Sequence, residues 1–465
     1  MDKLDQATKI SIDMIEALPT PYGLVRNGVA PDHPEVKNIQ HDFDQLFEKQ
    51  STESHDPVHF YGNVRVGQDI SLQELRDRYH VVVLAYGCDS DRSLPCLSGN
   101  EDHVEGVVFS AREFVAWYNG HVDYQHMGAK IQAALQSGPQ NIVIVGQGNV
   151  ALDCARILAK SYEEMRDSDI TSSALDILAA PTDTSEGPRT IHVVGRRGHI
   201  QGAFTIKELR ELTKLGHATL HIRPEELEMG LTEASREELK SLRPKVRIDK
   251  LLQGHSKKAV SESQQPTNIY LRFLCNPIGF EAADDGNVSR VICERTRLEG
   301  APMEQQAVGT GEIEALDASL VLVSIGYKAV PIPETEQWYD EQQGVLINNH
   351  GVLEGPSREN GGGVYVSGWL KRGPSGIIGT NIADAKDTVA SILHDMKSNE
   401  LDTLAATSEQ TSLQELLSSR GVSYVSWEAY RKIESKEADE SRKRSSDQPR
   451  EKILSREEQL TVANS

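Results

Sequence analysis

The sequence has few cysteines, no long apolar run and no excess of positive charge, and each of these absences excludes a class of protein. Its five cysteines form no CxxC pair and show no metal-ligand spacing, which argues against structural disulfides, a metal site and a dithiol redox centre. No stretch reaches the roughly 20 apolar residues that a membrane-spanning helix needs. The net charge of −21 argues against general nucleic-acid binding, which requires a basic surface. Any redox chemistry must therefore come from a bound cofactor.

The N-terminal residues lack the patterns of targeting segments. There is neither a basic start nor an apolar core before a cleavage site, so a secretory signal peptide is not expected. Asp2 and Asp5 are two acids at the very start of the chain, whereas transit peptides are rich in arginine and poor in acids. The chain then enters a predicted strand at residues 10–16. We therefore expect no targeting peptide in this chain.

The first part of the chain contains two apolar segments that predict strands of a parallel sheet. Residues 10–16 form the first, and the run 80–86, which ends at a glycine, forms the second. A continuous apolar run of this kind is typical of a strand buried on both faces. Between them, Ser71 and Glu74 have the spacing of a capping box, which predicts a helix from there to about Tyr79.

A second unit has the order strand, glycine turn, helix, strand. An apolar strand is predicted at residues 141–145, a helix after the glycine turn, and another strand at residues 190–194. This is the βαβ order of a doubly wound sheet, to which the apolar run 320–325 returns the chain. We therefore predict the α/β class with a Rossmann-like dinucleotide-binding fold.

Three other features are predicted from composition and pattern. Polar residues at 160–189 indicate an elongated surface excursion between the helix and the second strand of this unit. Residues 268–276 and 289–297 have the pattern of hairpin strands. From residue 434 the chain is charged and has no apolar anchors, which predicts a disordered tail.

Gly146, Gly148 and Ala151 form a GxGxxA turn between the predicted strand and helix. In a dinucleotide-binding turn, the first glycine permits a tight bend and the second lets a pyrophosphate approach the backbone. The small third residue allows close packing, and the helix N-terminus attracts the phosphates. A tight turn without a ligand is the alternative, since glycine-rich turns are common. The flanking strand and helix favour a dinucleotide.

Arg196 and Arg197 follow the next predicted strand, where an NAD site has a carboxylate for the ribose hydroxyls. Two guanidinium groups at this place can grip a 2′-phosphate, which a carboxylate would repel. The gap from Gly146 exceeds the usual spacing of about 20 residues, and the excursion at 160–189 accounts for most of it. Simple surface charge is the alternative, but the preceding glycine turn favours NADP.

Glu208 has two interpretations that the sequence leaves open. It lies three residues after Thr205, at the start of a predicted helix, so the pair fits a capping box. The other interpretation is a contact to the nicotinamide side of a bound dinucleotide.

Six strings of the sequence resemble the adrenodoxin reductase family, the mitochondrial ferredoxin–NADP reductases. They occur in the family's order and together span roughly residues 10 to 435. The strings are residues 21–26, 28–37, 145–153, 194–198, 204–210 and 367–376. Their length and order exclude coincidence as an explanation.

The resemblance implies two Rossmann-like domains of the glutathione reductase type, with an NADP domain inserted in a split FAD domain. The implied boundaries are residues 1–104 and 331–433 for the FAD domain, 105–330 for the NADP domain and 434–465 for the tail. The implied cofactors are FAD and NADP, and the implied reaction passes a hydride from NADPH to FAD and then single electrons to a 2Fe–2S ferredoxin. The implied location is the mitochondrial matrix, with peripheral association to the inner membrane.

By the same resemblance, Glu16 holds the ribose of FAD at a strand end, where an ordinary strand-end acid is the alternative. Trp369 offers an apolar face to the flavin, and the helix that begins at Gly376 has N–H groups to stabilise negative charge on it. Taken alone, both features are typical of plain structure. The other expected FAD contacts are Leu24, Val66, Ile377 and Ile378. The expected NADP contacts are Gly146, Gln147, Gly148, Asn149, Val150, Arg196, Arg197, Glu208 and Gly376.

The resemblance also implies a proton-relay role for His33 near the flavin, with Asp153 as its companion. A structural or solvated histidine is the alternative, because isolated histidines usually have no catalytic part.

The partner implied by the resemblance is acidic, so an acidic reductase needs a local basic dock. Residues 240–250 supply five bases and one acid. Arg210, Arg243 and Arg247 match docking positions of the family. A solvated charged face is the alternative. Electrostatic docking predicts turnover that falls as salt rises.

The chain departs from the family at its N-terminus. In the family, a strand, a GxGxxG turn for the FAD pyrophosphate and a helix precede the string that matches residues 21–26, and residues 1–60 contain no such turn. We therefore expect weak or absent FAD binding and an unstable flavin domain if the chain is made as written; the alternative is a shortened or incomplete form of a working enzyme. Two function classes stay open, an oxidoreductase and a catalytically inactive remnant that binds NADP or docks ferredoxin.

Overall fold

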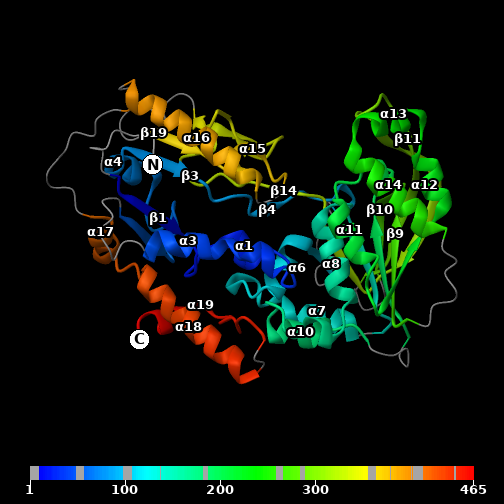
Figure 1. The fold of residues 1–465 in the computed structure, drawn as a ribbon, viewed down its shortest axis with the longest axis horizontal. Coiled ribbons are helices and arrows are strands. Elements are labelled where there is room, and N and C mark those ends of the chain that lie inside the picture. Colours follow the sequence, from blue (N-terminus) through cyan, green and yellow to red (C-terminus); the bar gives the residue numbers. More distant parts are fainter. Residues whose placement is uncertain are drawn as a thin grey trace.

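The computed structural model describes residues 10–48, 57–97, 107–136, 138–181, 187–257, 265–282, 288–353, 363–376, 379–398, 401, 412–444 and 447–465. Figure 1 shows these residues as two lobes, with a helical C-terminal segment below the first lobe in this view. No helix in the described part of the chain is both long and apolar enough to cross a membrane.

The second lobe is built on a six-stranded parallel sheet with the strand order β5-β13-β6-β7-β9-β8. Its central strands are apolar because both faces are covered, and Ile142, Val143 and Ile144 are fully buried. The strand, turn, helix and strand predicted over residues 141–194 are confirmed. The strands are β5 (Val108–Ser110), β6 (Asn141–Val145), β7 (Arg189–Val194), β8 (Ala218–Ile222), β9 (Thr267–Arg272) and β13 (Leu320–Val323).

Helices and a smaller antiparallel sheet pack around this parallel sheet (Figure 1). The small sheet has the order β10-β11-β12, with β10 (Cys275–Ala282), β11 (Val288–Glu299) and β12 (Gln306–Asp317). The helices are α6 (Ala111–Tyr118), α7 (Met127–Gln136), α8 (Asn149–Ala159), α9 (Tyr162–Met165), α10 (Ser172–Leu178), α11 (Ile206–Leu212), α12 (Pro224–Gly230), α13 (Glu233–Ser241) and α14 (Arg243–Ser256).

The hairpin predicted for residues 268–276 and 289–297 is only partly correct. The first segment divides between β9, which lies parallel in the main sheet, and β10, which pairs with β11. The division falls at Leu274, whose φ of 54° turns the chain between the two strands. A pattern of alternating residues therefore located strands but did not show that one of them belongs to a different sheet.

The first lobe has two small sheets. β1 (Ile12–Glu16) pairs in parallel with β2 (Val58–Gly62), and the other sheet has the order β17-β18-β19-β3. No pairing between β1 and β3 occurs among the described residues, so the sheet of this lobe is divided. The other sheet consists of β3 (Val81–Leu84), β17 (Asn348–Asn349), β18 (Val352–Leu353) and β19 (Gly363–Val366).

The helices of the first lobe are short except for α16 (Thr380–Lys397). The predicted capping box is confirmed, since Ser71 caps α4 and exchanges hydrogen bonds with Glu74. The remaining helices are α1 (Gly23–Asn27), α2 (Pro34–Lys37), α3 (Ile39–Glu48), α4 (Leu72–Arg78), α15 (Trp369–Arg372) and α17 (Leu413–Ser419). Two further short strands, β15 (Tyr339–Asp340) and β16 (Val345–Leu346), form a ribbon of their own.

A two-stranded antiparallel ribbon connects the lobes. It pairs β4 (Ser90–Asp91), where the chain leaves the first lobe, with β14 (Tyr327–Lys328), where the chain returns. The buried apolar core of the second lobe comes from residues 94–323, and the cores of the first lobe come from segments on both sides of that range. The second lobe is therefore an insertion within the first.

The prediction of a surface excursion at residues 160–189 is wrong for the described part of that segment. Ile170, Leu175 and Leu178 are buried in the core of the second lobe, and α10 carries two of them. In α10 the buried residues Ala174, Leu175 and Leu178 recur at helical spacing, which makes one face of this helix apolar in spite of the polar composition of the segment. Residues 182–186 lie outside the described residues.

The prediction of a disordered tail from residue 434 is also wrong for the described residues. The tail contains most of α18 (Trp427–Arg444) and all of α19 (Arg456–Ala463), which pack on each other. Part of the anchoring is ionic: Arg26 of the first lobe lies 2.5 Å from Glu437, and their side chains are only 2% and 0% exposed. Composition predicted disorder because it counts charged residues as solvated, whereas this pair is buried.

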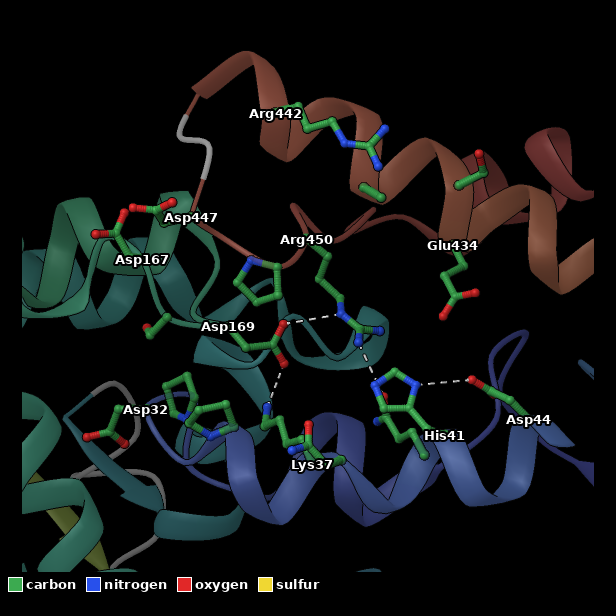
Figure 2. Close-up of a pocket in the computed structure, with 18 of the residues that line it drawn as sticks. Asp32, Lys37, His41, Asp44, Asp167, Asp169, Glu434, Arg442, Asp447 and Arg450 are labelled. Atoms are coloured by element: carbon green, nitrogen blue, oxygen red, sulfur yellow. Dashed lines mark hydrogen bonds and ion pairs between the residues drawn. The ribbon is translucent and has the colours of Figure 1, made fainter.

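A cluster of buried charges joins the C-terminal segment to both lobes. Asp169 of the second lobe forms ion pairs with Lys37 of α2 (2.6 Å) and with Lys452 (3.0 Å). Arg450 Nε lies 3.4 Å from the same carboxylate, and Figure 2 shows Lys37 and Arg450 on either side of it. Burial alone would raise the pKa of Asp169, but the three cations hold it well below its usual range.

We expect Asp169→Asn to lower the free energy of unfolding at pH 7 by roughly 3 to 5 kcal/mol, because two buried lysines lose their partner. The folded pKa of Asp169 is depressed, so its contribution is present above the carboxyl's unfolded pKa and is lost as the pH falls towards the folded value. The deficit of the variant should therefore shrink only below about pH 4. Urea unfolding across this pH range measures it.

Asp167→Asn is the matched control, because Asp167 is a nearby aspartate with a side chain that is 41% exposed. Its substitution should change the free energy of unfolding by less than about 0.5 kcal/mol. Equal losses in the two variants would contradict a special role for the buried cluster.

Candidate functional site

The predicted GxGxxA turn lies between the end of β6 and the start of α8. Gly146 has a φ of 143°, and a Cβ there would overlap the carbonyl oxygen of Ser324, so only glycine fits. Gly148 is different, because no atom outside its chain neighbours lies within 4 Å of a Cβ built on it. Ala151 is fully buried and Val150 partly buried against the core. The turn therefore combines a tight bend with open space beside the backbone, as dinucleotide binding requires.

The turn is held in place by hydrogen bonds to later parts of the lobe. The carbonyl oxygen of Gln147 accepts the N–H of Ala203 (2.7 Å), and its side-chain Nε2 donates to the carbonyl oxygen of Val193 in β7 (3.1 Å). Asn149 Oδ1 accepts the N–H of Thr205 (2.8 Å). The first-turn N–H groups of α8 have no acceptor within their own helix, so they are available to a phosphate at the open position.

Arg196 and Arg197 lie in the turn that follows β7. The turn is rigid, because the carbonyl oxygen of Arg196 accepts from Thr296 Oγ1 (2.6 Å) and that of Arg197 from the N–H of Leu274 (3.1 Å). Both arginines are exposed, and neither forms an ion pair with a carboxylate of the described residues. Burial and then the neighbouring Arg196 lower the pKa of Arg197. Two like charges are thus held in adjacent residues, and no carboxylate in the described part of the chain is ion-paired with either, which suits an anionic ligand.

The capping box predicted for Thr205 and Glu208 is not formed. Thr205 caps α11 and its hydroxyl accepts from the N–H of Lys207 (3.3 Å), while its own N–H donates to Asn149 instead of to Glu208. Glu208 accepts a hydrogen bond from the Thr205 hydroxyl. The residue is therefore linked through Thr205 and Asn149 to the glycine turn, and its contact with a nicotinamide stays a prediction.

A cluster of charged side chains lies where the two lobes meet. His33 Nε2 is 2.9 Å from Glu211 Oε2 and 3.1 Å from Arg156 Nη1. Arg156 also donates to Glu211 (2.7 Å) and to Asp32 (3.0 Å). His33 precedes α2 in the first lobe, whereas Arg156 and Glu211 come from α8 and α11 of the second. We call these residues, with Asp153, the interlobe cluster.

Asp153 contacts Arg156 (2.8 Å) and makes no hydrogen bond with His33. Burial raises the pKa of Asp153 to about 6, and the positive charges of Arg156 and His33 oppose that rise. The sequence predicted His33 and Asp153, and the structure brings both into one cluster through Arg156. The sequence analysis did not predict Arg156 or Glu211 as members of this cluster. Arg156 had a signal, since it is a charged residue three positions after Asp153 in an otherwise apolar helix.

Three of the residues predicted to contact FAD lie in the N-terminal part of the first lobe. Glu16 ends β1, and its Oε1 accepts the N–H of Leu18 (3.0 Å). Burial raises the pKa of Glu16, although its backbone hydrogen bonds oppose the rise. Leu24 is 40% exposed, and Val66 packs partly against the lobe's core. Glu16 is thus at the strand end where a ribose-binding acid is expected, and its role stays a prediction.

The ends of β3 and β19 offer space for a flat group. Gly87 and Gly368 follow these neighbouring parallel strands with φ of 78° and 76°, and no atom outside their chain neighbours lies within 4 Å of a Cβ built on either. Trp369 comes next, with its ring centroid 6.0 Å from that of Tyr327. Gly376 has a φ of 83°. These residues fit a flavin; the predicted contacts Ile377 and Ile378 lie outside the described residues.

The residues predicted to dock the partner share one region of the second lobe. Arg210 lies on α11, and Arg243 and Arg247 lie on α14, which packs against α11. All three side chains are exposed. Arg243 and Arg247 are four residues apart, so they occupy the same face of their helix.

A cavity of about 1140 Å³ lies between α3, the region of α9 and α18 (Figure 2). Several of its charged lining residues pair with one another, as Lys160 does with Asp32 (2.7 Å) and Arg442 with Asp439 (2.8 Å). None of the residues predicted to bind FAD or NADP lines it. We therefore do not assign a cofactor to this cavity.

The chain is similar to curated mitochondrial NADPH:adrenodoxin oxidoreductases, whereas no protein-family model matches it. The Arabidopsis thaliana protein is 41% identical over 461 residues, which cover 97% of this chain and 90% of the relative. The Bos taurus protein is 38% identical over 467 residues, with coverages of 99% and 88%. NADPH-ferredoxin reductase FprA of Mycobacterium tuberculosis is 37% identical over 390 residues, with coverages of 83% and 77%.

A solved structure of Mycobacterium tuberculosis FprA in complex with NADPH has a similar fold. The TM-score is 0.84 at 33% identity, and the match covers 100% of this chain and 94% of that one. The predicted fold class, two Rossmann-like domains of the glutathione reductase type, is therefore confirmed.

We expect Asp153→Asn to alter how stability depends on pH. Because the folded pKa of Asp153 is raised to about 6, the folded protein holds this proton more tightly than the unfolded chain. As the pH rises from about 4 to about 6, ionising the buried carboxyl costs the wild type stability. Relative to the variant, the wild type should therefore lose on the order of 2 kcal/mol over this range.

Urea unfolding of both proteins at pH 4 to 7 checks this expectation. Asp176→Asn, which changes an exposed acid of α10, is the control and should leave the pH profile parallel to that of the wild type. If the pH profile of Asp153→Asn is also parallel to that of the wild type, the pKa of Asp153 is not raised in the folded protein.

Proposed function

The chain belongs to the NADPH:adrenodoxin oxidoreductase family, and we propose that the residues described above carry the family's reaction in it. It is an FAD-dependent oxidoreductase that passes electrons from NADPH to an iron–sulfur ferredoxin. A catalytically inactive remnant is not favoured, because relatives matched over 97% of the chain are named as oxidoreductases. The observation that carries the assignment to residues is the open glycine turn at Gly148, followed by Arg196 and Arg197, for which no ion pair occurs among the described residues.

We assign NADPH to the second lobe. The pyrophosphate would lie at Gly148, where the turn is open and the N-terminus of α8 attracts negative charge. The 2′-phosphate would be gripped by Arg196 and Arg197, which form no ion pair with a carboxylate in the part of the chain that the structure describes. Because the backbone of this turn is already fixed, binding of the ligand costs little conformational entropy.

We assign FAD to the first lobe. When bound, it supplies the chemistry that converts a two-electron hydride donor into a source of single electrons. Gly87 and Gly368 leave room for the ring system beside the backbone, and Trp369 provides an apolar surface. Glu16, at the end of β1, is positioned to accept hydrogen bonds from ribose hydroxyls.

The interlobe cluster holds a proton between the two proposed cofactor sites, and its side chains keep one another in place. Arg156 fixes Asp153 and Glu211, and Glu211 fixes His33. Burial raises the pKa of Asp153 to about 6, which brings it close to neutral pH, where a general acid or base is most effective. His33, buried and bonded to Glu211, is the group of this cluster that the first lobe contributes.

The exposed arginines of α11 and α14 form the dock that we propose for the ferredoxin. Arg210, Arg243 and Arg247 present positive charge on a protein whose net charge is −21, so they attract an acidic partner to one region. Steering of this kind raises the rate of encounter more than the lifetime of the complex.

A mitochondrial location is proposed from the relatives, which are named as mitochondrial proteins. The finer proposal is the matrix, with peripheral association to the inner membrane. We further propose an FAD domain of residues 1–104 and 331–433 and an NADP domain of residues 105–330. The inserted core of residues 94–323 supports this division; the segment 434–465 is then a helical extension that packs on the FAD domain.

The purified protein should show flavin absorbance and should reduce cytochrome c with NADPH when a 2Fe–2S ferredoxin is added. Turnover should fall as salt rises, because salt screens the attraction between the arginine dock and the acidic partner. Omission of the ferredoxin is the control and should abolish most of the reduction. A colourless preparation that stays inert with added FAD contradicts the enzyme assignment.

Replacement of both Arg196 and Arg197 by alanine should raise the KM for NADPH roughly 100-fold, because two charge-assisted contacts to the 2′-phosphate are lost. The KM for NADH, which lacks that phosphate, should change little. Arg166→Ala, at an arginine that is 51% exposed, is the control for loss of surface charge. Steady-state kinetics with both nucleotides make the measurement, and equal effects on the two would refute the phosphate assignment.

A further inference from the structure

Lys245 is a half-buried cation that the proposed roles leave unused. It lies in the first turn of α14, and its Nζ donates a hydrogen bond to the carbonyl oxygen of Gly202. Gly202 follows the arginine turn at residues 196–197 by only a few positions. The side chain therefore points back towards the part of the lobe that carries Arg197.

No carboxylate of the described residues forms an ion pair with Lys245. The carboxylate whose charge acts on both Lys245 and Arg197 is Glu238. Glu238 is only 4% exposed and already accepts from Met303 N (2.8 Å) and from the side chain of Gln305 (2.9 Å). It is thus satisfied by neutral donors, and the positive charges around it exceed its own.

Lys245 and Arg197 are close enough to repel each other. Burial lowers the pKa of Lys245, and the charge of Arg197 lowers it further. Among the described residues, the hydrogen-bond partner of Lys245 is a neutral carbonyl oxygen, and a half-buried lysine beside an arginine is unfavourable unless an anion compensates it further. The arrangement of the three cations, Arg196, Arg197 and Lys245, thus calls for a doubly charged ligand.

Lys245 does not belong to the face that we assign to the ferredoxin. With about 100° of rotation per residue in an α-helix, Lys245 lies roughly 200° around α14 from both Arg243 and Arg247. Those two arginines are exposed, whereas Lys245 turns to the opposite side and reaches Gly202. One helix therefore presents two arginines outwards and one lysine to the arginine turn.

We propose that Lys245 is a third cation of the site for the 2′-phosphate of NADPH and helps to determine the preference for NADPH over NADH. The inference rests on the proposed function, because it places the 2′-phosphate at Arg196 and Arg197. A dianionic phosphate between the arginines and the lysine attracts all three cations and offsets most of their charge, whereas a free ribose hydroxyl offsets none of it.

The test measures binding of two small probes, adenosine 2′,5′-bisphosphate and adenosine 5′-monophosphate, to the full chain by titration calorimetry. Lys245→Met should raise the Kd for the bisphosphate about tenfold, as expected for one lost charge-assisted contact. The Kd for the monophosphate should change less than about twofold, because only one probe carries the 2′-phosphate. Lys245→Arg keeps the charge and should restore most of the bisphosphate affinity.

Lys240→Met is the matched control, since Lys240 is a lysine of the neighbouring helix with a side chain that is 72% exposed. It should leave both Kd values unchanged. The KM for ferredoxin should also stay unchanged in Lys245→Met, which separates the proposal from a docking role.

Two outcomes would overturn the role of Lys245 alone: a Lys245→Met protein that binds the bisphosphate like Lys240→Met, or one in which only the KM for ferredoxin rises. A different failure points to the proposed function itself. If the wild type binds both probes equally, the 2′-phosphate site is not present and the NADPH assignment fails together with this inference.

Discussion

Asp169 is a carboxylate placed away from water, and its three cationic partners come from parts of the chain that are far apart in sequence. Lys37 belongs to α2 of the first lobe, and Arg450 and Lys452 belong to the C-terminal segment. Charges removed from water stay stable only when partners surround them, so these segments are fixed together. His33 is the residue that precedes α2, so the anchor at Lys37 also fixes the histidine that meets Glu211 and Arg156. The geometry of the interlobe cluster therefore depends on a charge outside it.

Hydrophobic pattern and turn chemistry predicted the parts of the fold that are determined locally. The unit of β6, α8 and β7 and the capping box at Ser71 follow from neighbouring residues. The C-terminal helices could not be predicted in this way, because part of what holds them is ionic. Arg26 and Glu437 are 411 residues apart. The sequence around each residue therefore does not show that its charge will be buried and neutralised by the other. The composition of this charged segment therefore predicts that it is exposed to solvent, although Glu437 is buried.

The same limit applies to the candidate site. Gly146, Gly148, Arg196 and Arg197 were predictable, because a turn between a strand and a helix needs particular residues at fixed positions. The cap at Thr205 was mispredicted because its N–H has a better acceptor 56 residues earlier, on Asn149. Arg156 stands out in the sequence as a charge in an apolar helix, but its contact with His33 and that of Glu211 could not be predicted. The histidine comes from the other lobe, 123 and 178 residues away along the chain. Contacts between lobes leave no local spacing to recognise.

The protein uses charge in two opposite ways, and the contrast identifies where a ligand belongs. Some of its buried carboxylates are compensated by buried cations: Glu226, for example, is fully buried and lies 2.9 Å from both Arg272 and Arg295. Arg196 and Arg197 form no ion pair with a carboxylate of the described residues, although acids outnumber bases 70 to 49 in the chain. With so many carboxylates available, leaving adjacent cations unpaired is unfavourable unless something else neutralises them. An anionic ligand removes that cost when it binds, and a backbone turn already held by Thr296 and Leu274 does not have to be ordered first.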